Sequence, residues 1–273
     1  MMTFATRPLV PFGVEIVDVD LRGEIAPGRF AALRRLVVEE GLVLARGQAM
    51  SAQEHCRLGE RFGSLESLSL ERDRRASGVL VVSNLGDDGR TLGPRDRRMR
   101  TLAANELWHT DSSFRDRPAS FSLLSAVVVP DQGGDTLFAS LRRGWDTLDP
   151  GLRAGLHGLR AVHDYTAMGF PPVAHPIVRV HPESRRVGLY LSEHARAVEG
   201  WPEDRGRALI DRLLSRCTRP SEVYRHSWRV GDLLLWDNRS MLHRAQGFEA
   251  DHPRVMHHVR VAGTEGVIPA PPS

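Results

Sequence analysis

The segment from Glu106 to Phe114, ELWHTDSSF, places a histidine and an aspartate two residues apart, between a tryptophan and a phenylalanine. On an extended backbone, side chains two residues apart point to the same face. His109 and Asp111 would then aim an imidazole and a carboxylate at one point. Such a pair can hold a metal ion, or it can be a buried hydrogen-bonded pair without chemistry, and the rest of the chain must distinguish the two.

A later histidine could supply a third ligand. An iron site of the facial-triad type needs two histidines and one carboxylate, and it leaves cis positions open for a cosubstrate and O2. The segment 236–245, WDNRSMLHRA, carries His243. A rival pair, His181 and Glu183, falls in an expected turn, which is too mobile and exposed for a preorganised metal site. The sequence therefore predicts a metal site made of His109, Asp111 and His243.

An arginine-containing strand follows the late histidine. Alternate residues of the segment 254–260, RVMHHVR, would share one face of a strand, and His257 would lie on the other face. Arginine is well suited to bind a carboxylate through two hydrogen bonds. These alternate residues, three of them polar, would line a pocket. They are Arg254, Met256, His258 and Arg260.

Local patterns predict many short strands and a few helices. Apolar residues at helical spacing predict helices over 27–41, 51–62, 145–159 and 202–216, with Ser51 and Glu54 forming a capping box. Strands are expected at 13–21, 42–44, 78–84, 119–129, 135–139, 177–181, 187–191, 224–228, 232–236 and 255–261. This pattern indicates a β-sandwich or barrel with helices packed on it, in a single domain spanning residues 1–273.

Three segments are expected to be irregular. Residues 86–104 are polar and rich in arginine, which predicts a long loop that ends at the opening motif. Pro171, Pro172 and Pro176 are expected to break the chain. The tail 264–273 is rich in glycine and proline and is expected to be loose.

The composition is that of an ordinary globular chain. Hydrophobic residues make up 41% and charged residues 26% of the 273 positions. No apolar run is long enough to cross a membrane, and the N-terminal residues lack the apolar core of a signal peptide, so a cytoplasmic protein is expected. The two cysteines, Cys56 and Cys217, have no metal-binding or redox spacing and are expected to be reduced.

The charge of the chain gives weaker evidence about function. The formal net charge is +3, and every basic residue is arginine. The dense cluster at 95–100 is either a solvated loop or a basic rim that attracts an anionic substrate. Nucleic acid is disfavoured as a partner because no stacking aromatic residues are interleaved with the arginines.

Taken in order, the motifs WHTD, GGDT, WDNRxxxHRA and PRVMHH resemble those of the TauD/TfdA family of Fe(II)- and 2-oxoglutarate-dependent dioxygenases. The resemblance runs nearly end to end, from FGVEIVDVDL through RFGSLE and HPIVRVHPESRR to the last arginine strand. It implies a double-stranded β-helix (jelly roll, cupin-like) core with flanking helices. It also implies Fe(II), 2-oxoglutarate and O2 as the cofactor and cosubstrates, and often a homodimer or homotetramer.

The resemblance also implies roles for individual residues. His109, Asp111 and His243 match the iron ligands. Thr136 and Arg254 match the residues that bind the far carboxylate of 2-oxoglutarate, and Trp236 matches a residue lining that pocket. Asn105 matches an asparagine near the primary substrate, and His258 or Arg260 would hold a carboxylate of the substrate.

Departures from the family pattern narrow the substrate. Where the taurine enzyme has a substrate-binding histidine and a sulfonate-binding arginine, this chain has Leu68 and His258. Taurine is therefore disfavoured, and RVMHHVRVAG together with EHARAVEGW resembles the branch that oxidises phenoxypropionate and phenoxyacetate. The intact Asp111 also separates the chain from related halogenases, which lack this carboxylate.

The expected activity is hydroxylation of an aliphatic C–H bond in a small carboxylate-bearing substrate, coupled to conversion of 2-oxoglutarate to succinate and CO2. Hydroxylation next to an ether oxygen would cleave the ether. A tailoring reaction on an amino acid or a fatty-acid-derived acid, including desaturation or cyclisation, stays open. So do two other classes: a zinc hydrolase with the same ligands, and a non-catalytic metal- or ligand-binding protein on the same fold.

Overall fold

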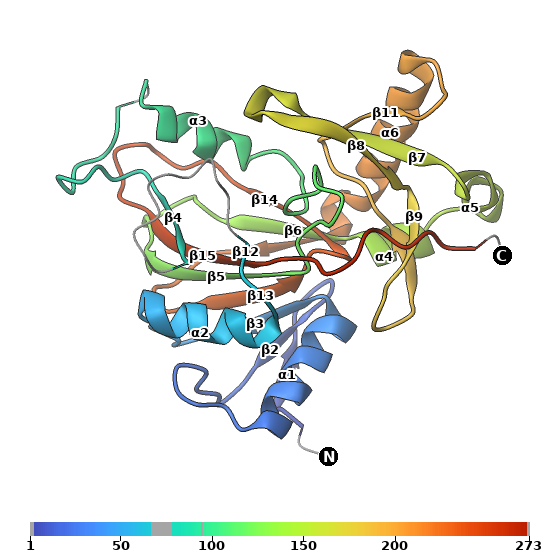
Figure 1. Cartoon of the computed structure of the whole chain (residues 1–273). Coiled ribbons are helices and arrows are strands. Elements are labelled where there is room, and N and C mark those ends of the chain that lie inside the picture. The colour runs from blue at the N-terminus through green and yellow to red at the C-terminus, as the bar shows by residue number, and fades with distance from the viewer. Residues whose placement is uncertain (1–2, 67–77, 94, 272–273) are drawn as a thin grey trace.

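A computed structural model describes residues 3–66, 78–93 and 95–271, and strands make up more of it than helices. The strands form four sheets with helices on their outer faces (Figure 1). The predicted fold class, mainly β with flanking helices, is confirmed. Leu68, one of the expected departures from the taurine enzyme, lies outside the described residues. The prediction of a single domain stays a prediction.

The largest sheet has seven strands in the order β1-β2-β3-β13-β5-β15-β4. Among the strands that the structure describes, only β2 and β3 pair in parallel. The central strands β13, β5 and β15 come from distant parts of the sequence, so the sheet joins the two halves of the chain. Its strands are β1 (Thr6–Pro8), β2 (Val14–Ile16), β3 (Leu42–Ala45), β13 (Leu233–Asp237), β5 (Phe121–Val128), β15 (Val255–Val261) and β4 (Leu80–Ser83).

Helices α1 (Pro27–Glu40) and α2 (Ala52–Phe62) cover one face of this sheet and lie below it in Figure 1. Helix α1 ends at Gly41, whose φ of 78° suits glycine. Helix α2 begins at the predicted capping box, in which Ser51 and Glu54 satisfy each other's backbone N–H groups. Local sequence signals therefore determine where both helices begin or end.

The other face of the large sheet packs on a three-stranded sheet with the order β12-β6-β14. Side chains from both sheets meet in one apolar cluster that includes Phe138 and Trp236. The small sheet is made of β12 (Val223–His226), β6 (Thr136–Ser140) and β14 (Met241–Ala245). This sandwich carries most of the residues that the sequence assigns to a site.

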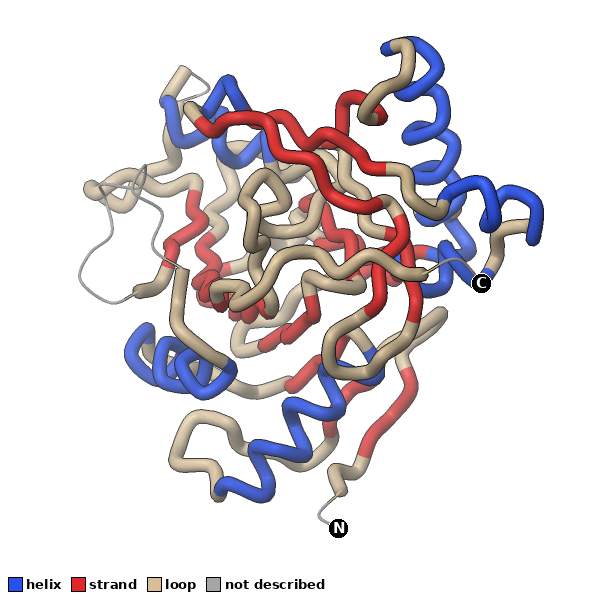
Figure 2. Tube along the Cα trace, turned by 45° about the vertical axis from the view of Figure 1, so that its right-hand side comes forward, coloured by secondary structure: helices blue, strands red, loops and turns tan. Residues whose placement is uncertain are grey.

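A second layer of structure lies above the sandwich (Figure 2). It contains a three-stranded sheet with the order β11-β7-β8. The predicted hairpin of β9 and β10 lies beside the sandwich and extends downwards in Figure 1. The strands of this sheet and hairpin are β11 (Ala195–Val198), β7 (Arg160–Tyr165), β8 (Phe170–Pro176), β9 (Val178–Val180) and β10 (Val187–Leu189). The helical elements are α3 (Arg97–Ala104), α4 (Leu141–Asp146), α5 (Pro150–Leu156), α6 (Glu203–Cys217), η1 (Thr166–Met168) and η2 (Pro220–Glu222).

Two predictions, one of a loop and one of a helix, need correction. The segment 86–104 is not a loop throughout, because α3 begins after Asp96, whose side chain accepts a hydrogen bond from the Arg98 backbone N–H. The expected helix 145–159 is instead two helices, α4 and α5. Asp149 caps the second one and Pro150 occupies its first turn, where the missing N–H costs nothing.

Three further segments differ from expectation. The strand expected at 13–21 is regular only at Val14–Ile16. The prolines of 171–176 lie within β8, an edge strand of its sheet, where residues without an N–H are tolerated. The tail is not loose near its end, since Ile268 and Ala270 exchange backbone hydrogen bonds with Val180 and Val178.

Other expectations concern cysteines and membranes. Cys56 and Cys217 are both buried, and neither forms a disulfide within the described residues, in line with the expectation that they are reduced. Among the described residues, no helix combines the length and apolar character needed to span a bilayer.

A buried histidine of α2 makes stability depend on pH. His55 is fully buried, neither ring nitrogen has a hydrogen-bond partner within the described residues, and burial lowers its pKa to about 3. The unfolded chain takes up this proton near pH 6.5, so the free energy of unfolding falls as the pH drops from about 6.5 towards 3. We expect His55→Leu to reduce this loss by about 2–4 kcal/mol in denaturant titrations at descending pH.

The control is His252→Gln, which removes a histidine whose side chain is 46% exposed and should leave the pH dependence unchanged. Parallel loss of stability in wild type and His55→Leu would contradict the prediction.

Candidate active site

Backbone pairing brings the two histidine motifs together. The N–H groups of His109 and His243 each donate to the other residue's carbonyl, at 3.0 and 2.8 Å. The Ala245 N–H donates to the Asn105 carbonyl at 2.7 Å. His243 lies on β14, whereas His109 lies in the connection from α3 to β5. This two-way bridge holds the two imidazole rings 4.1 Å apart, centroid to centroid.

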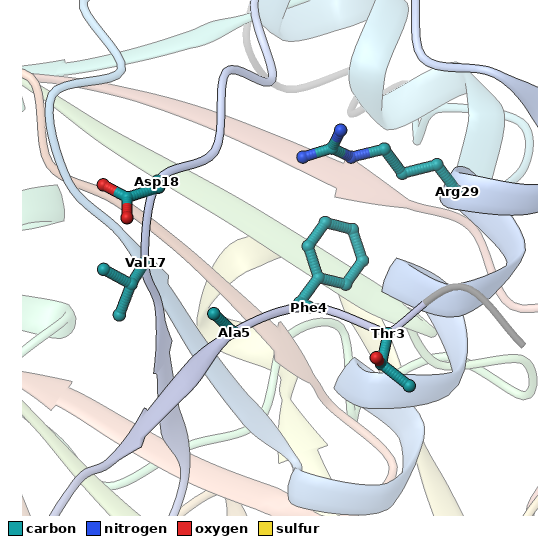
Figure 3. Close-up of a pocket in the computed structure, with 6 residues that line it drawn as sticks. All are labelled: Thr3, Phe4, Ala5, Val17, Asp18 and Arg29. Carbon is teal, nitrogen blue, oxygen red and sulfur yellow. The ribbon is translucent and has the colours of Figure 1, made fainter.

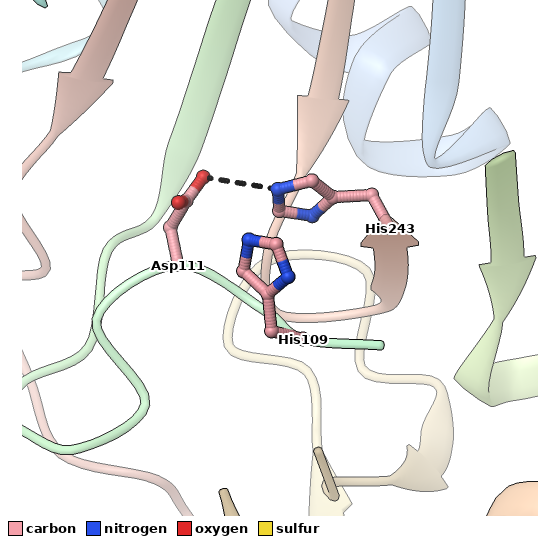
Figure 4. A group of neighbouring side chains, drawn as sticks. All are labelled: His109, Asp111 and His243. Atoms are coloured by element: carbon pink, nitrogen blue, oxygen red, sulfur yellow. Dashed lines mark ion pairs between the residues drawn. The ribbon is translucent and has the colours of Figure 1, made fainter. Parts of the chain in front are cut away.

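The three predicted metal ligands converge in the structure. His109, Asp111 and His243 each offer one ligand atom, and these atoms all lie within 4.8 Å of one another (Figure 4). The distance from His243 Nε2 to Asp111 Oδ2 is 3.7 Å. Contrary to the expectation from the sequence, His109 and Asp111 do not lie on one strand. The chain turns at Asp111, and Ser112 has a φ of 57°.

The donor set fits a divalent metal. His109 Nδ1 lies 2.7 Å from the Leu107 carbonyl, so Nδ1 carries the proton and the Nε2 lone pair remains for a metal. Burial lowers the pKa of both His109 and His243, so both rings are neutral at neutral pH. Burial opposes ionisation of Asp111, but the interactions with His258 and with the Arg260 guanidinium outweigh it and hold its pKa well below the usual range. Two neutral imidazoles and one carboxylate suit ferrous iron.

A buried polar network fixes Asp111. The Ser122 hydroxyl on β5 donates to Asp111 Oδ2 at 2.6 Å, and Asn238 Nδ2 donates to Ser122 Oγ at 2.7 Å. Asn238 Oδ1 accepts from the Asp111 N–H at 3.2 Å and from Trp236 Nε1 at 2.9 Å. Neither Ser122 nor Asn238 was identified from the sequence. Asn238 stands inside the WDNR motif, which was the available signal, whereas Ser122 had none.

We expect Ser122→Ala to weaken metal binding about 10-fold, because partners of metal ligands typically contribute 10- to 100-fold to affinity. Titration of the metal-free protein with Mn(II) would measure this. The matched control is Ser125→Ala on the same strand, since Ser125 is also buried but its hydroxyl has no hydrogen-bond partner among the described residues. Equal Mn(II) affinities in the two variants would contradict the prediction.

Arg254 is buried beside Gly134 and has few hydrogen-bond partners. It is 6% exposed, its Nη2 donates to the Gly134 carbonyl at 3.1 Å, and its Nε has no partner among the described residues. No ion pair between Arg254 and a described carboxylate is present. Burial lowers its pKa to about 10. A side chain on Gly134 would lie 3.1 Å from Arg254 Nε, so glycine leaves room for the guanidinium. Such a cation fits the carboxylate of a bound ligand.

Thr136 lies close to Gly134, the residue that packs against Arg254. It begins β6 two residues after Gly134, is 3% exposed, and accepts a hydrogen bond from Trp228 Nε1 at 3.0 Å. Its hydroxyl proton remains available to a ligand oxygen. Thr136 begins a strand of the small sheet and Arg254 directly precedes β15 of the large sheet, so the two residues that could bind one carboxylate come from both sheets of the sandwich.

The remaining predicted residues lie around Asp111. His258 Nε2 is 3.5 Å from Asp111 Oδ2, and Arg260 Nη1 is 3.9 Å from Asp111 Oδ1. Trp236 is fully buried, with its ring 4.8 Å from that of His243 and 5.6 Å from that of His258. Asn105 is half-buried at the end of α3. The cosubstrate role of Trp236 and the substrate role of Asn105 stay predictions.

A hollow at the N-terminal edge is separate from this site. Its volume is about 190 Å³, and Figure 3 shows that its walls come from the residues just before β1, those just after β2, and α1. None of the candidate site residues lines it. Its lining residues are Thr3, Phe4, Ala5, Val17, Asp18 and Arg29.

The sandwich, the His–Asp–His cluster and the buried arginine together define a class, the 2-oxoglutarate-dependent non-haem iron oxygenases. The family described as "Taurine catabolism dioxygenase TauD, TfdA family" matches residues 5–261. The chain therefore belongs to the TauD/TfdA family of Fe(II)- and 2-oxoglutarate-dependent dioxygenases.

Individual relatives agree with this assignment. The chain is 37% identical to an alpha-ketoglutarate-dependent 2,4-dichlorophenoxyacetate dioxygenase of Cupriavidus pinatubonensis, with 91% of this chain and 94% of the relative covered. It is 32% identical to an (S)-phenoxypropionate/alpha-ketoglutarate dioxygenase of Delftia acidovorans, covering 97% and 96%. The crystal structure of AAD-2 in complex with Mn(II) and N-oxalylglycine matches with a TM-score of 0.92 and 34% identity, covering 98% and 100%.

Proposed function

We propose that this dioxygenase hydroxylates the ether-bearing carbon of a small aryloxyalkanoic acid and thereby cleaves the ether. His109, Asp111 and His243 hold Fe(II), and Arg254 and Thr136 hold the far carboxylate of 2-oxoglutarate in a jelly-roll core. The observation that carries the proposal is the convergence of three metal-binding side chains in a fold that also buries an arginine without a carboxylate partner among the described residues. A zinc hydrolase does not need that arginine.

Iron and 2-oxoglutarate would supply the oxidising power, with one atom of O2 going to succinate and the other to the substrate hydroxyl. The protein's own contribution is positional. The Ser122 hydroxyl donates to the Asp111 carboxylate, and the Asp111 N–H donates to Asn238 Oδ1. These two hydrogen bonds keep the carboxylate oriented before substrate arrives. Arg254 orients the cosubstrate by pairing with the carboxylate distant from the reacting end.

Aromatic rings beside His109 favour an aryl group in the substrate. The His194 ring lies 6.1 Å from that of His109, and the Tyr165 ring lies 4.7 Å from that of His194. Tyr165 stacks on Phe114 with ring centroids 4.5 Å apart, and both side chains are partly exposed. Offset or edge contacts with such rings stabilise a bound aromatic ring. The substrate carboxylate would then pair with Arg260 or His258, which lie beside Asp111.

Ether cleavage follows from the position of the hydroxyl group. Hydroxylation of the carbon that bears the aryl–oxygen bond gives a hemiacetal. As its hydroxyl becomes a carbonyl, the bond to the aryl oxygen breaks and the proton passes to that oxygen, which leaves as a phenol. A phenol and an oxo acid are therefore the expected products, together with succinate and CO2.

The test is substrate-dependent formation of succinate and phenol. Wild type and His109→Ala would be supplied with Fe(II), ascorbate and 2-oxoglutarate, and screened with phenoxyacetates, phenoxypropionates, taurine, amino acids and medium-chain acids. We expect aryloxyalkanoates to give succinate and phenol in equal amounts with wild type alone. Succinate without phenol, with an amino acid or a medium-chain acid as substrate, would instead support a tailoring oxygenase. Bound iron without turnover of any compound would support a binding protein.

A further inference from the structure

The segment HPIVRVHPES, residues 175–184, contains no proposed ligand, yet it contacts both parts of the chain that carry ligands. It runs from the end of β8 through β9 into the turn before β10. Its two histidines, His175 and His181, are 3% and 2% exposed. Each uses ring nitrogens to hold another segment in place.

His175 holds the loop that follows Asp111. Its Nε2 lies 3.0 Å from the Ser113 carbonyl, which can only accept, so the Nε2–H donates. Between Asp111 and Ser113, Ser112 has a φ of 57°, a conformation that costs free energy for a residue with a side chain. Such a conformation persists only where the surroundings impose it.

The same loop has two further attachments. The Ser112 hydroxyl donates to Glu66 Oε2 at 2.7 Å. The Ser113 hydroxyl lies 3.3 Å from the Ser192 hydroxyl, which in turn lies 3.3 Å from His163 Nδ1. The backbone on the C-terminal side of Asp111 is therefore fixed from several directions, and His175 supplies the direct bond to its main chain.

His181 holds the turn that leads to His243. Its Nδ1 accepts from the backbone N–H groups of Glu183 and Ser184, at 3.2 and 3.1 Å. Nε2 must then carry the proton, and it donates to Asp237 Oδ2 at 3.0 Å. Asp237 is fully buried and also accepts two hydrogen bonds from the Arg239 guanidinium.

Asp237 is adjacent to Asn238, which accepts from the Asp111 N–H and donates to Ser122. Asp237 is the last residue of β13, and Asn238 begins the turn that joins β13 to β14, the strand of His243. His175 and His181 therefore reach the metal cluster by two separate routes, one to each chain segment that carries ligands. The rival pair of His181 and Glu183 is engaged elsewhere, since Glu183 pairs with Arg34 and Arg239.

We infer that His175 and His181 are positioning residues for the iron site: they hold the Asp111 loop and the turn before His243 in the metal-binding arrangement before the metal arrives. The inference rests on the proposed ligand set. Without these bonds the ligands would have to be ordered during binding, which lowers metal affinity.

The test compares His175→Gln with His175→Asn. Both variants carry the same amide, but the glutamine amide reaches about as far as Nε2, whereas the asparagine amide is one methylene shorter. The metal-free protein would be titrated with Mn(II), with free Mn(II) followed by electron paramagnetic resonance. We expect asparagine to weaken Mn(II) binding about 10-fold, the lower end of the range for indirect partners of a metal, and glutamine to restore it to within about 3-fold. For His181→Leu we expect a loss as large as that for His175→Asn.

The control for a general loss of stability is Leu213→Ala, which removes a fully buried side chain of α6. It should lower Tm but leave Mn(II) affinity unchanged. Equal Mn(II) affinity in His175→Asn and wild type would overturn the inference, and so would equal weakening in Leu213→Ala. Failure of wild type to bind Mn(II), or unchanged binding by His109→Ala, would overturn the ligand set itself and the inference with it.

Discussion

Replacement of Asp111 by alanine is expected to reduce metal affinity more than about 100-fold, beyond the usual effect of losing an indirect partner of a metal. The buried carboxylate is the one anion among the three proposed ligands, and it faces His258 and Arg260 as well as His243. Without it, a divalent cation would be opposed by the Arg260 guanidinium and supported only by two neutral rings. Mn(II) titration and succinate formation would both measure the loss.

Asp111→Asn separates charge from shape. The amide oxygen can still accept from the Ser122 hydroxyl, which donates to Asp111 at 2.6 Å, but it carries no negative charge. We expect this variant to fold like wild type and to bind Mn(II) nearly as weakly as the alanine variant. Stoichiometric Mn(II) binding by Asp111→Ala would show that the proposed ligand set is wrong.

Replacement of Arg254 by methionine is expected to raise the KM for 2-oxoglutarate about 100-fold. A hydrogen bond to a charged group is worth roughly 1.5–3 kcal/mol, and the buried guanidinium can make two to one carboxylate. The kcat should fall much less, because Arg254 would act at the end of the cosubstrate that does not react. Arg254→Lys keeps the charge but loses the two-pronged geometry, so we expect an intermediate KM.

Arg254→Met should also raise the thermal stability of the ligand-free protein. Burial lowers the pKa of Arg254 to about 10, so the guanidinium stays charged at neutral pH but is less stable in the free protein than it would be in water. We therefore expect Arg254→Met to raise Tm without 2-oxoglutarate and to lose the rise in Tm that 2-oxoglutarate gives wild type.

Arg143→Ala is the control for Arg254. It removes a 44% exposed arginine that pairs with Glu222, and it should leave both KM and the ligand-induced rise in Tm unchanged. An unchanged KM in Arg254→Met would contradict the cosubstrate role.

Much of the framework was predictable because its causes are local. The capping box of Ser51 and Glu54 determines where α2 begins, and the positive φ of Gly41 ends α1. Short, largely apolar runs predicted β5, β13 and β15, which form the centre of the large sheet. Two errors were also avoidable: Asp149 before Pro150 is a helix-start signal inside the expected helix 145–159, and Met99, Leu102 and Ala103 have helical spacing inside the expected loop 86–104.

The residues of the candidate site could be predicted from the sequence, but the way the structure holds them together could not. The sequence named His109, Asp111 and His243 through their motifs, and the structure brings their ligand atoms within 4.8 Å. The geometric reason first given for His109 and Asp111, a shared strand face, was wrong. The pair converges because the chain turns at Asp111, with Ser112 at a φ of 57°.

By itself, therefore, the sequence determined the fold class, the family and the side chains able to bind metal and cosubstrate, because short motifs and periodicity encode these. Only the tertiary structure decided how those side chains are held. Ser122 and Asn238 are 116 residues apart, and His181 and Asp237 are 56 apart. No local pattern encodes hydrogen bonds between residues so far apart in sequence. They form only when the packing of the two sheets and the hairpin brings these buried polar groups together, away from water that could otherwise satisfy them.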